Sequence, residues 1–199
     1  MREVFAQTIR DPRFSIADGT FEKSANVPDG WADVVFGATA FHWTRDYVAA
    51  VKELNRVLKP DGVVIFIWQL EDRDTDGWAK DMWELGDVYQ HQTGNYKTHF
   101  MDWPFHDVFN TDEYKQHFKA PEKEHIDYYS EGTDDIVIAR FKTWSKIASL
   151  EPQKQSEVAQ QLKDVLTSRA DTKQWLDKEK GTFKVPMHTP VITIRRVSQ

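Results

Sequence analysis

Two apolar runs with an amphipathic helix between them constrain the fold of this chain more than any other feature. The runs, Ala-Asp-Val-Val-Phe-Gly at 32–37 and Val-Val-Ile-Phe-Ile-Trp at 63–68, are typical of strands covered on both faces, as central parallel strands are. Between them, apolar residues recur at helical spacing on one face: Tyr47, Val51, Leu54 and Leu58. A strand, a helix and a strand in this order predict a right-handed βαβ unit.

Short signals mark where these elements begin and end. Thr44 is placed to cap the helix with Asp46 in its first turn, and Pro60-Asp61-Gly62 is expected to end the helix and turn the chain. A further short strand is expected from Arg13 to Ile16, ended by Asp18 and Gly19. A helix over Met1–Arg10 precedes it, because Val4, Phe5, Thr8 and Ile9 fall on one face.

The second half of the chain combines a polar stretch with segments that have helix and strand patterns. Residues 70–132 are polar and rich in aromatic and histidine residues, which favours an insertion or lid. A helix is expected over 135–150 with Thr133 as its cap, a second from Pro152, and a short third over 171–178. The tail, 183–185 and 191–197, alternates like two strands joined through Pro186 to Pro190, which predicts a terminal antiparallel hairpin.

Composition excludes several classes of protein. The chain has 199 residues, 40% of them hydrophobic, which fits one domain over 1–199. Its net charge of -6 disfavours nucleic acid and anionic membranes as partners. Because the chain has no cysteine, disulfides, thiolate metal sites and cysteine nucleophiles are excluded. With no apolar run of transmembrane length and no signal-peptide pattern, we expect a soluble cytoplasmic protein.

The sequence lacks the common short motifs that bind metal ions or phosphate groups. The histidines other than His42 show no HxxxH or HxH pairing, so no metal site is expected. No Walker or GxGxxG phosphate-binding pattern occurs.

Four motifs resemble the middle of a class I S-adenosylmethionine-dependent methyltransferase, with closest similarity to the trans-aconitate methyltransferase-like subgroup. They are Ala17-Asp18-Gly19, the strand at 33–37, Ala38-Thr39-Ala40-Phe41-His42-Trp43, and Leu54-Asn55-Arg56-Val57-Leu58-Lys59-Pro60-Asp61-Gly62. The subgroup commonly has a glycine where Asp61 stands. Phe141-Lys142-Thr143-Trp144-Ser145 also resembles a late helix of that subgroup.

The resemblance implies a fold and a cofactor. The fold is α/β: a Rossmann-like methyltransferase sheet, mostly parallel, with a C-terminal antiparallel hairpin and a helical lid insertion. Its parts are a core over 1–69, the lid over 70–132, and C-terminal helices and hairpin over 133–199. The implied cofactor is S-adenosylmethionine, and the implied substrate is a small-molecule acceptor.

Cofactor-binding residues follow from the same resemblance, because ligands of such sheets lie beyond the carboxyl ends of the strands. Asp18 would accept a hydrogen bond from the adenine amino group, while a backbone N–H of Gly19 or Thr20 meets a ring nitrogen. The small residues after the second strand would let the methionine end approach the backbone: Gly37, Ala38 and Thr39. The alternatives are that Asp18 only shapes a turn and that the small residues reflect tight packing.

His42 and Trp43 would line the pocket where methyl donor and acceptor meet, with His42 as the one candidate general base. Aromatic packing in a first turn is their alternative role. Three further tryptophans are candidates for the far wall of the substrate site: Trp68, Trp103 and Trp144. If the acceptor is a carboxylate, no base is needed, and a cationic group would hold a second carboxylate; the candidates are Arg45, Arg73 and Arg140.

The family's glycine-rich loop and its ribose-binding acidic residue precede the helix that Met1–Phe5 resembles, so an N-terminally incomplete sheet with impaired cofactor binding is expected. Such a sheet exposes a strand edge that attracts another chain. Three explanations stay open: a truncated product, a homodimer that covers the edge, and a noncatalytic binding or scaffold module.

Overall fold

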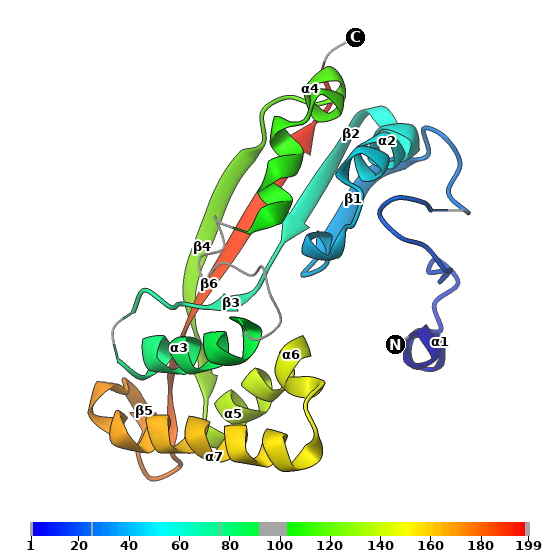
Figure 1. Ribbon diagram of the computed structural model, residues 1–199. Coiled ribbons are helices and arrows are strands. Elements are labelled where there is room, and N and C mark those ends of the chain that lie inside the picture. The colour runs from blue at the N-terminus through cyan, green and yellow to red at the C-terminus, as the bar shows by residue number, and fades with distance from the viewer. Residues whose placement is uncertain (1, 25, 76, 92–102, 198–199) are drawn as a thin grey trace. The chain divides into compact units, whose positions relative to one another are not determined.

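The chain forms two compact units. The computed structural model describes residues 2–24, 26–75, 77–91 and 103–197 (Figure 1). Unit 1 comprises Met1–Ile67, Phe105–Lys123 and Ile192–Gln199, and unit 2 comprises Trp68–Pro104 and Glu124–Val191.

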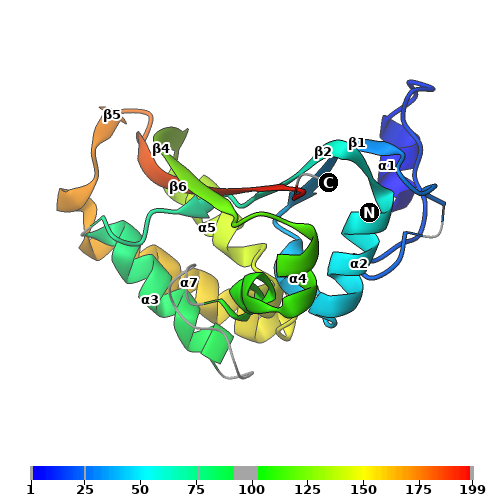
Figure 2. The same cartoon turned by 90° about the horizontal axis from the view of Figure 1, so that it is seen from above.

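The predicted βαβ unit is confirmed in unit 1. Strand β1 (Ala32–Ala38) pairs in parallel with β2 (Leu58–Ile67), with Val35 opposite Val64 and Gly37 opposite Phe66. Helix α2 (Tyr47–Val57) connects them and lies beside the pair in both views (Figures 1 and 2). Val51 and Leu54 are buried as predicted, together with Ala50 and Val57, whereas Tyr47 is only partly buried and Leu58 belongs to β2.

Two local expectations for this unit are wrong. The cap of α2 is Asp46 rather than Thr44, because the Asp46 carboxylate accepts the Ala49 N–H at 3.0 Å. Residues 60–62 do not turn the chain but belong to β2, which begins directly after α2.

Strand β1 is not covered on both faces as predicted. Val34 is 51% exposed and Phe36 is 59% exposed, whereas Val64 on the neighbouring strand is fully buried. The order of hydrogen-bonded strands is β1-β2-β6-β3, with β1 at one end. Since the side chains of Val34 and Phe36 point to the same face of the strand, that face of β1 is open.

The N-terminal segment contains the predicted helix but not the predicted strand. Helix α1 (Arg2–Thr8) forms, and none of its residues is buried. Residues 13–16 form no strand. In the described part of the chain, β2 is the only strand recorded beside β1, so residues 13–16 have no strand partner there. An isolated bridge between Thr20 and Lys23 is the first β interaction.

The rest of unit 1 is an aromatic core. It includes the 3-10 helices η1 (Phe41–Trp43) and η3 (Pro104–Asn110) and helix α4 (Asp112–His117). Phe41 stacks on Phe66 with 4.2 Å between ring centroids, and Phe105 meets Phe41 edge-on at 6.1 Å. Part of the segment predicted as a lid, residues 105–123, therefore belongs to this unit.

Unit 2 is a group of helices with a mainly antiparallel set of strands. Its elements are β3 (Leu70–Glu71), α3 (Trp78–His91), α5 (Asp134–Lys142), α6 (Ser145–Ala148), α7 (Pro152–Ser168), η4 (Ala170–Thr172), β5 (Trp175–Asp177) and most of β4 (Glu122–Gly132) and β6 (Thr182–Arg195). Strands β3 and β5 run antiparallel to β6, and β4 also pairs with β6. The core holds Met82 of α3, Phe141 of α5 and Leu162 of α7.

The start of α7 at Pro152 and the Thr133 cap of α5 are confirmed. The helix expected over 135–150 is instead two helices, α5 and α6, separated at Thr143 and Trp144. The helix expected over 171–178 is wrong, since η4 and β5 occupy those residues.

The predicted C-terminal hairpin is also wrong, because 182–195 form the single strand β6. Proline is tolerated there through its carbonyl: Trp68 N–H donates to Pro190 O at 3.1 Å, and Asp72 N–H donates to Pro186 O at 2.9 Å. The strand pairing is mixed rather than mostly parallel, since of the registers recorded β1–β2 is parallel and β3–β6 and β5–β6 are antiparallel.

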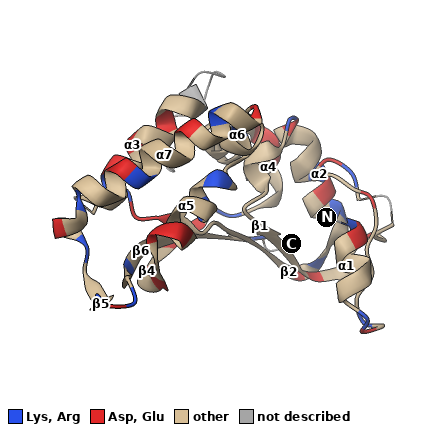
Figure 3. Ribbon diagram, turned by 90° about the horizontal axis from the view of Figure 1, so that it is seen from below, with Lys and Arg blue, Asp and Glu red and all other residues tan. Residues whose placement is uncertain are grey.

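Charges of both signs are interspersed along α3 and α7 (Figure 3). Within the described residues, no helix combines the length and the apolar composition needed to cross a bilayer.

Candidate functional site

A large cavity lies within unit 1. Its volume is about 1010 Å³, at the upper end of the roughly 300–1,000 Å³ typical of small-molecule sites. The segment 19–31, strand β1, η1 and α2 supply its walls: Gly19, Thr20, Phe21, Glu22, Ser24, Val27, Trp31, Ala32, Val34, Val35, Ala40, Trp43, Thr44, Arg45, Asp46, Glu53, Leu54 and Val57.

One arginine of α2 holds the irregular wall of this cavity. Arg56 Nη1 donates to Val27 O at 2.8 Å and to Asp29 Oδ1 at 2.5 Å. Arg56 Nε donates to Glu53 Oε2 at 2.8 Å, and Glu53 Oε1 also accepts the Ser24 N–H at 2.7 Å. A planar guanidinium is suited to such a set of acceptors because its donors point in fixed directions. Arg56 thus links Ser24, Val27 and Asp29 to α2.

Glu53 is held in its charged form by these bonds. The Arg56 guanidinium and, in addition, the Ser24 side chain and N–H lower the pKa of Glu53 to about 2, although burial acts in the opposite direction. Nearby, the Glu22 carboxylate accepts the backbone N–H of Arg45 at 2.9 Å and of Asp46 at 3.3 Å. The segment before β1 is therefore attached to both ends of α2.

The structure brings four of the candidate site residues to this cavity: Gly19, Thr20, Trp43 and Arg45. Trp43 is 52% exposed, so about half of this residue is accessible to solvent. Thr20 N–H donates to Lys23 O at 2.9 Å, which makes Gly19 the better candidate for the expected backbone donor. Asp18 does not line the cavity; its carboxylate is exposed and forms an ion pair with Arg2.

Gly37, Ala38 and Thr39 lie outside the cavity lining, at the carboxyl end of β1. A Cβ on Gly37 would lie 2.7 Å from Cδ1 of Phe66, so the absent side chain makes room for the Phe66 ring. Thr39 has a φ of 48°, a left-handed conformation that is costly for a β-branched residue. Its N–H donates to Ile67 O at 2.8 Å, which holds this strained residue beside the end of β2.

His42 is a neutral residue of η1. Burial lowers its pKa to about 4. Its ring lies 5.1 Å from that of Trp43. At neutral pH the imidazole is a hydrogen-bonding group rather than a cation, and with a pKa so far below 7 it is a weak proton acceptor.

The other three predicted tryptophans belong to unit 2. Trp68 is completely buried, and Trp103 is half-buried. Trp144 stacks on Phe141 with 4.6 Å between centroids and contacts Trp83 at 4.7 Å. The surroundings of Trp68 and Trp144 are those of core residues.

Much of the apolar wall was not predicted from the sequence, above all Trp31 and Val34. Trp31 directly follows the turn-forming Pro28-Asp29-Gly30, and an exposed tryptophan after a turn is a signal that periodicity does not capture.

Comparisons with known proteins identify the fold of this chain. Residues 1–66 match a family model described as a methyltransferase domain. A presumed type II methyltransferase from Anaeromyxobacter dehalogenans aligns with 96% of this chain and 75% of its own, at 18% identity and a TM-score of 0.60. A presumed methyltransferase from an antibiotic biosynthesis pathway of Anabaena variabilis aligns with 94% of this chain and 77% of its own, at 14% identity and a TM-score of 0.55. The chain has the methyltransferase fold. Among curated protein sequences, none matches.

The residues that line the cavity all come from one part of the sequence. Every residue that lines it falls between Gly19 and Val57, inside the segment that matches the methyltransferase domain. The Leu54–Gly62 motif, which carried the family resemblance, includes Arg56 and thus the residue that holds the cavity wall.

Proposed function

We propose that this chain is a cytoplasmic S-adenosylmethionine-dependent methyltransferase for a small-molecule acceptor, and that the cavity of unit 1 receives the adenosyl part of the cofactor. The observation that carries the proposal is that the whole cavity lining lies within the residues that match a methyltransferase domain. The lining fits the ligand, because apolar side chains and an accessible indole suit a planar aromatic base.

The cofactor supplies an electrophilic methyl group on a sulfonium. Such a displacement needs alignment and exclusion of water more than it needs a nucleophilic residue. We assign the adenine contacts to the Gly19 N–H and the Asp18 carboxylate, with Asp18 exchanging its present ion pair with Arg2 for that role. Trp43 offers a π face to positive charge, and neutral His42 offers a hydrogen bond that positions the acceptor.

A carboxylate is the acceptor that we favour, in line with the trans-aconitate methyltransferase-like motifs. Of the three arginines considered for holding a second carboxylate, Arg45 lines the cavity. The other two already engage carboxylates in unit 2: Arg73 with Asp87 at 3.6 Å, and Arg140 with Glu71.

These residues supply only part of a cofactor site. None of the nine glycines forms a Gly-x-Gly-x-Gly loop. We therefore propose that binding by this chain alone is weak, and that a second chain covering the open edge of β1 completes the site.

Titration calorimetry with S-adenosylhomocysteine tests the proposal, together with the molecular mass in solution. We expect micromolar binding that Asp18→Asn weakens. The matched control is Asp11→Asn, which alters another exposed carboxylate, paired with Arg13 in the same segment, and should leave binding unchanged. Absence of heat together with a stable dimer would reject the enzyme in favour of a noncatalytic module that dimerises through β1.

A further inference from the structure

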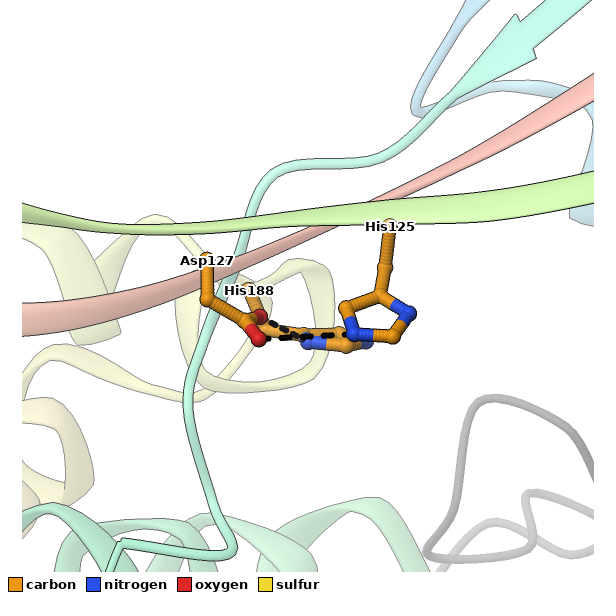
Figure 4. Close-up of side chains that lie close together, drawn as sticks. All are labelled: His125, Asp127 and His188. Atoms are coloured by element: carbon orange, nitrogen blue, oxygen red, sulfur yellow. Dashed lines mark hydrogen bonds and ion pairs between the residues drawn. The ribbon is translucent and has the colours of Figure 1, made fainter.

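Two histidines and an aspartate converge in unit 2, and none of the three belongs to a motif of the methyltransferase resemblance. His125 and Asp127 are two residues apart on β4, so their side chains project to the same face. His188 lies on β6, which pairs with β4. Figure 4 shows the three side chains directed toward one another, with both imidazole rings on the same side of the Asp127 carboxylate.

The distances are close to those of a ligand set. His188 Nδ1 lies 2.7 Å from Asp127 Oδ1, and His125 Nε2 lies 3.4 Å from Asp127 Oδ2. One ligand atom from each residue lies within 4.8 Å of the others. Bonds of about 2.0–2.1 Å to a tetrahedral Zn²⁺ place ligand atoms about 3.3 Å apart. The two distances to Asp127, 2.7 and 3.4 Å, bracket the separation between ligand atoms of such a site.

We propose that His125, Asp127 and His188 bind a divalent transition-metal cation, with Zn²⁺ as the reference ion. Two imidazoles and one carboxylate are donors that zinc-class cations accept, whereas Mg²⁺ and Ca²⁺ prefer all-oxygen sites. Three protein ligands leave at least one coordination position for water or another ligand.

An ordinary surface ion pair accounts less well for the cluster. Such a pair needs one histidine for one carboxylate, as in His117 and Glu113 of α4, which are 2.9 Å apart. Here each oxygen of Asp127 faces a different imidazole, and the two rings lie 4.9 Å apart. Two imidazoles brought together around a single carboxylate gain most from a shared cation.

The site is accessible to an ion from solvent. The side chains of His125 and Asp127 are 60% and 59% exposed, and that of His188 is 34% exposed. Because the ligands come from both β4 and β6, the bound ion would join two strands of unit 2. This role is independent of the methyl-donor cavity, whose residues are all in unit 1.

Calorimetric titration of tag-free, chelator-treated protein with ZnCl₂ tests the proposal. We expect one Zn²⁺ per chain with micromolar affinity. His125→Gln, Asp127→Asn and His188→Gln should each weaken binding by at least about tenfold, as loss of metal-site partners generally does. The matched control is His117→Gln, which removes a histidine from a pair without a third ligand and should bind as the unchanged protein does.

A measurement on the unchanged sequence guards against variants that fail to fold. In a histidine nitrogen NMR spectrum, Zn²⁺ should shift the ring resonances of His125 and His188 and leave that of His117 in place. The proposal is overturned if stoichiometric Zn²⁺ leaves both rings unshifted, or if the three variants and the control bind with equal affinity.

Discussion

Gly37 tests whether close packing at the end of β1 is a structural requirement. Replacing it with alanine adds a methyl group 2.7 Å from Cδ1 and 3.0 Å from Cε1 of Phe66, and 3.4 Å from Cζ of Phe21. Phe66 cannot move aside easily, because it is completely buried and stacked on Phe41. The change therefore forces an aromatic ring or the strand to shift.

The expected cost combines two opposing effects. Overpacking a core by one methyl group typically destabilises by about 1–3 kcal/mol. Replacing glycine in the unfolded chain returns about 0.4–1 kcal/mol, because the unfolded state loses conformational freedom. We expect Gly37→Ala to lower the free energy of unfolding by about 1–2 kcal/mol, measured by urea titration monitored by circular dichroism.

A double mutant and a control make the test specific. Phe66→Leu removes the clashing atoms, so the Gly37→Ala penalty should shrink in that background, which a double-mutant cycle measures. Gly19→Ala is the control, because its methyl group would meet Lys23 O at 3.4 Å and Ser24 Cα at 3.7 Å, which are ordinary contacts. A Gly37→Ala protein as stable as the control, or a penalty unchanged by Phe66→Leu, would refute the packing argument.

Three further predictions concern strain and charge in unit 1. Thr39→Gly should raise the free energy of unfolding by about 1 kcal/mol, since it relieves the φ of 48°; no gain would contradict the strain. Glu53→Gln should destabilise by about 1–3 kcal/mol at pH 7. Because the folded-state pKa of Glu53 is lowered to about 2, that difference should disappear as the pH falls from about 4.5 toward 2, and a constant difference would count against the Arg56 bond. NMR titration should find the His42 ring neutral down to about pH 4, and stability should fall as the pH drops from about 6.5 toward 4 unless His42→Gln is present.

Local pattern was sufficient for the βαβ unit and for the helices α1, α2 and α7. Tyr47–Val57 and Pro152–Ser168 carry their own periodicity and end signals, so their existence follows from neighbours a few residues away in sequence. Where two residues could both cap one helix, the sequence pattern did not decide between them. Both Thr44 and Asp46 are cap-forming residue types, and only the structure shows that Asp46 bonds the Ala49 N–H.

Strand identity depended on partners that the sequence does not reveal. Residues 13–16 have strand-forming side chains but no recorded neighbour, whereas Trp175–Asp177 becomes a strand because β6 lies beside it. The openness of β1 has the same origin, since burial of Val34 and Phe36 requires an element that covers them.

The candidate sites likewise include residues that a local pattern reveals and residues that only the fold brings together. His42 and Trp43 were noticed because they are adjacent, and the structure places Trp43 at the cavity. The His125, Asp127 and His188 cluster was missed because two of its members alternate along a strand and the third is 61 residues from Asp127. A His-x-Asp pair within a strand is the signal that would have drawn attention to it.

The two prolines of β6 determine how far β3 extends. Pro190 and Pro186 accept from Trp68 and Asp72, but neither has an N–H to return the bond, so a reciprocal pair is impossible at each end. Of the three residues between Trp68 and Asp72, Leu70 and Glu71 form β3, opposite His188 and Met187. The brevity of β3 is thus encoded more than a hundred residues downstream, and lengthening it would require editing β6.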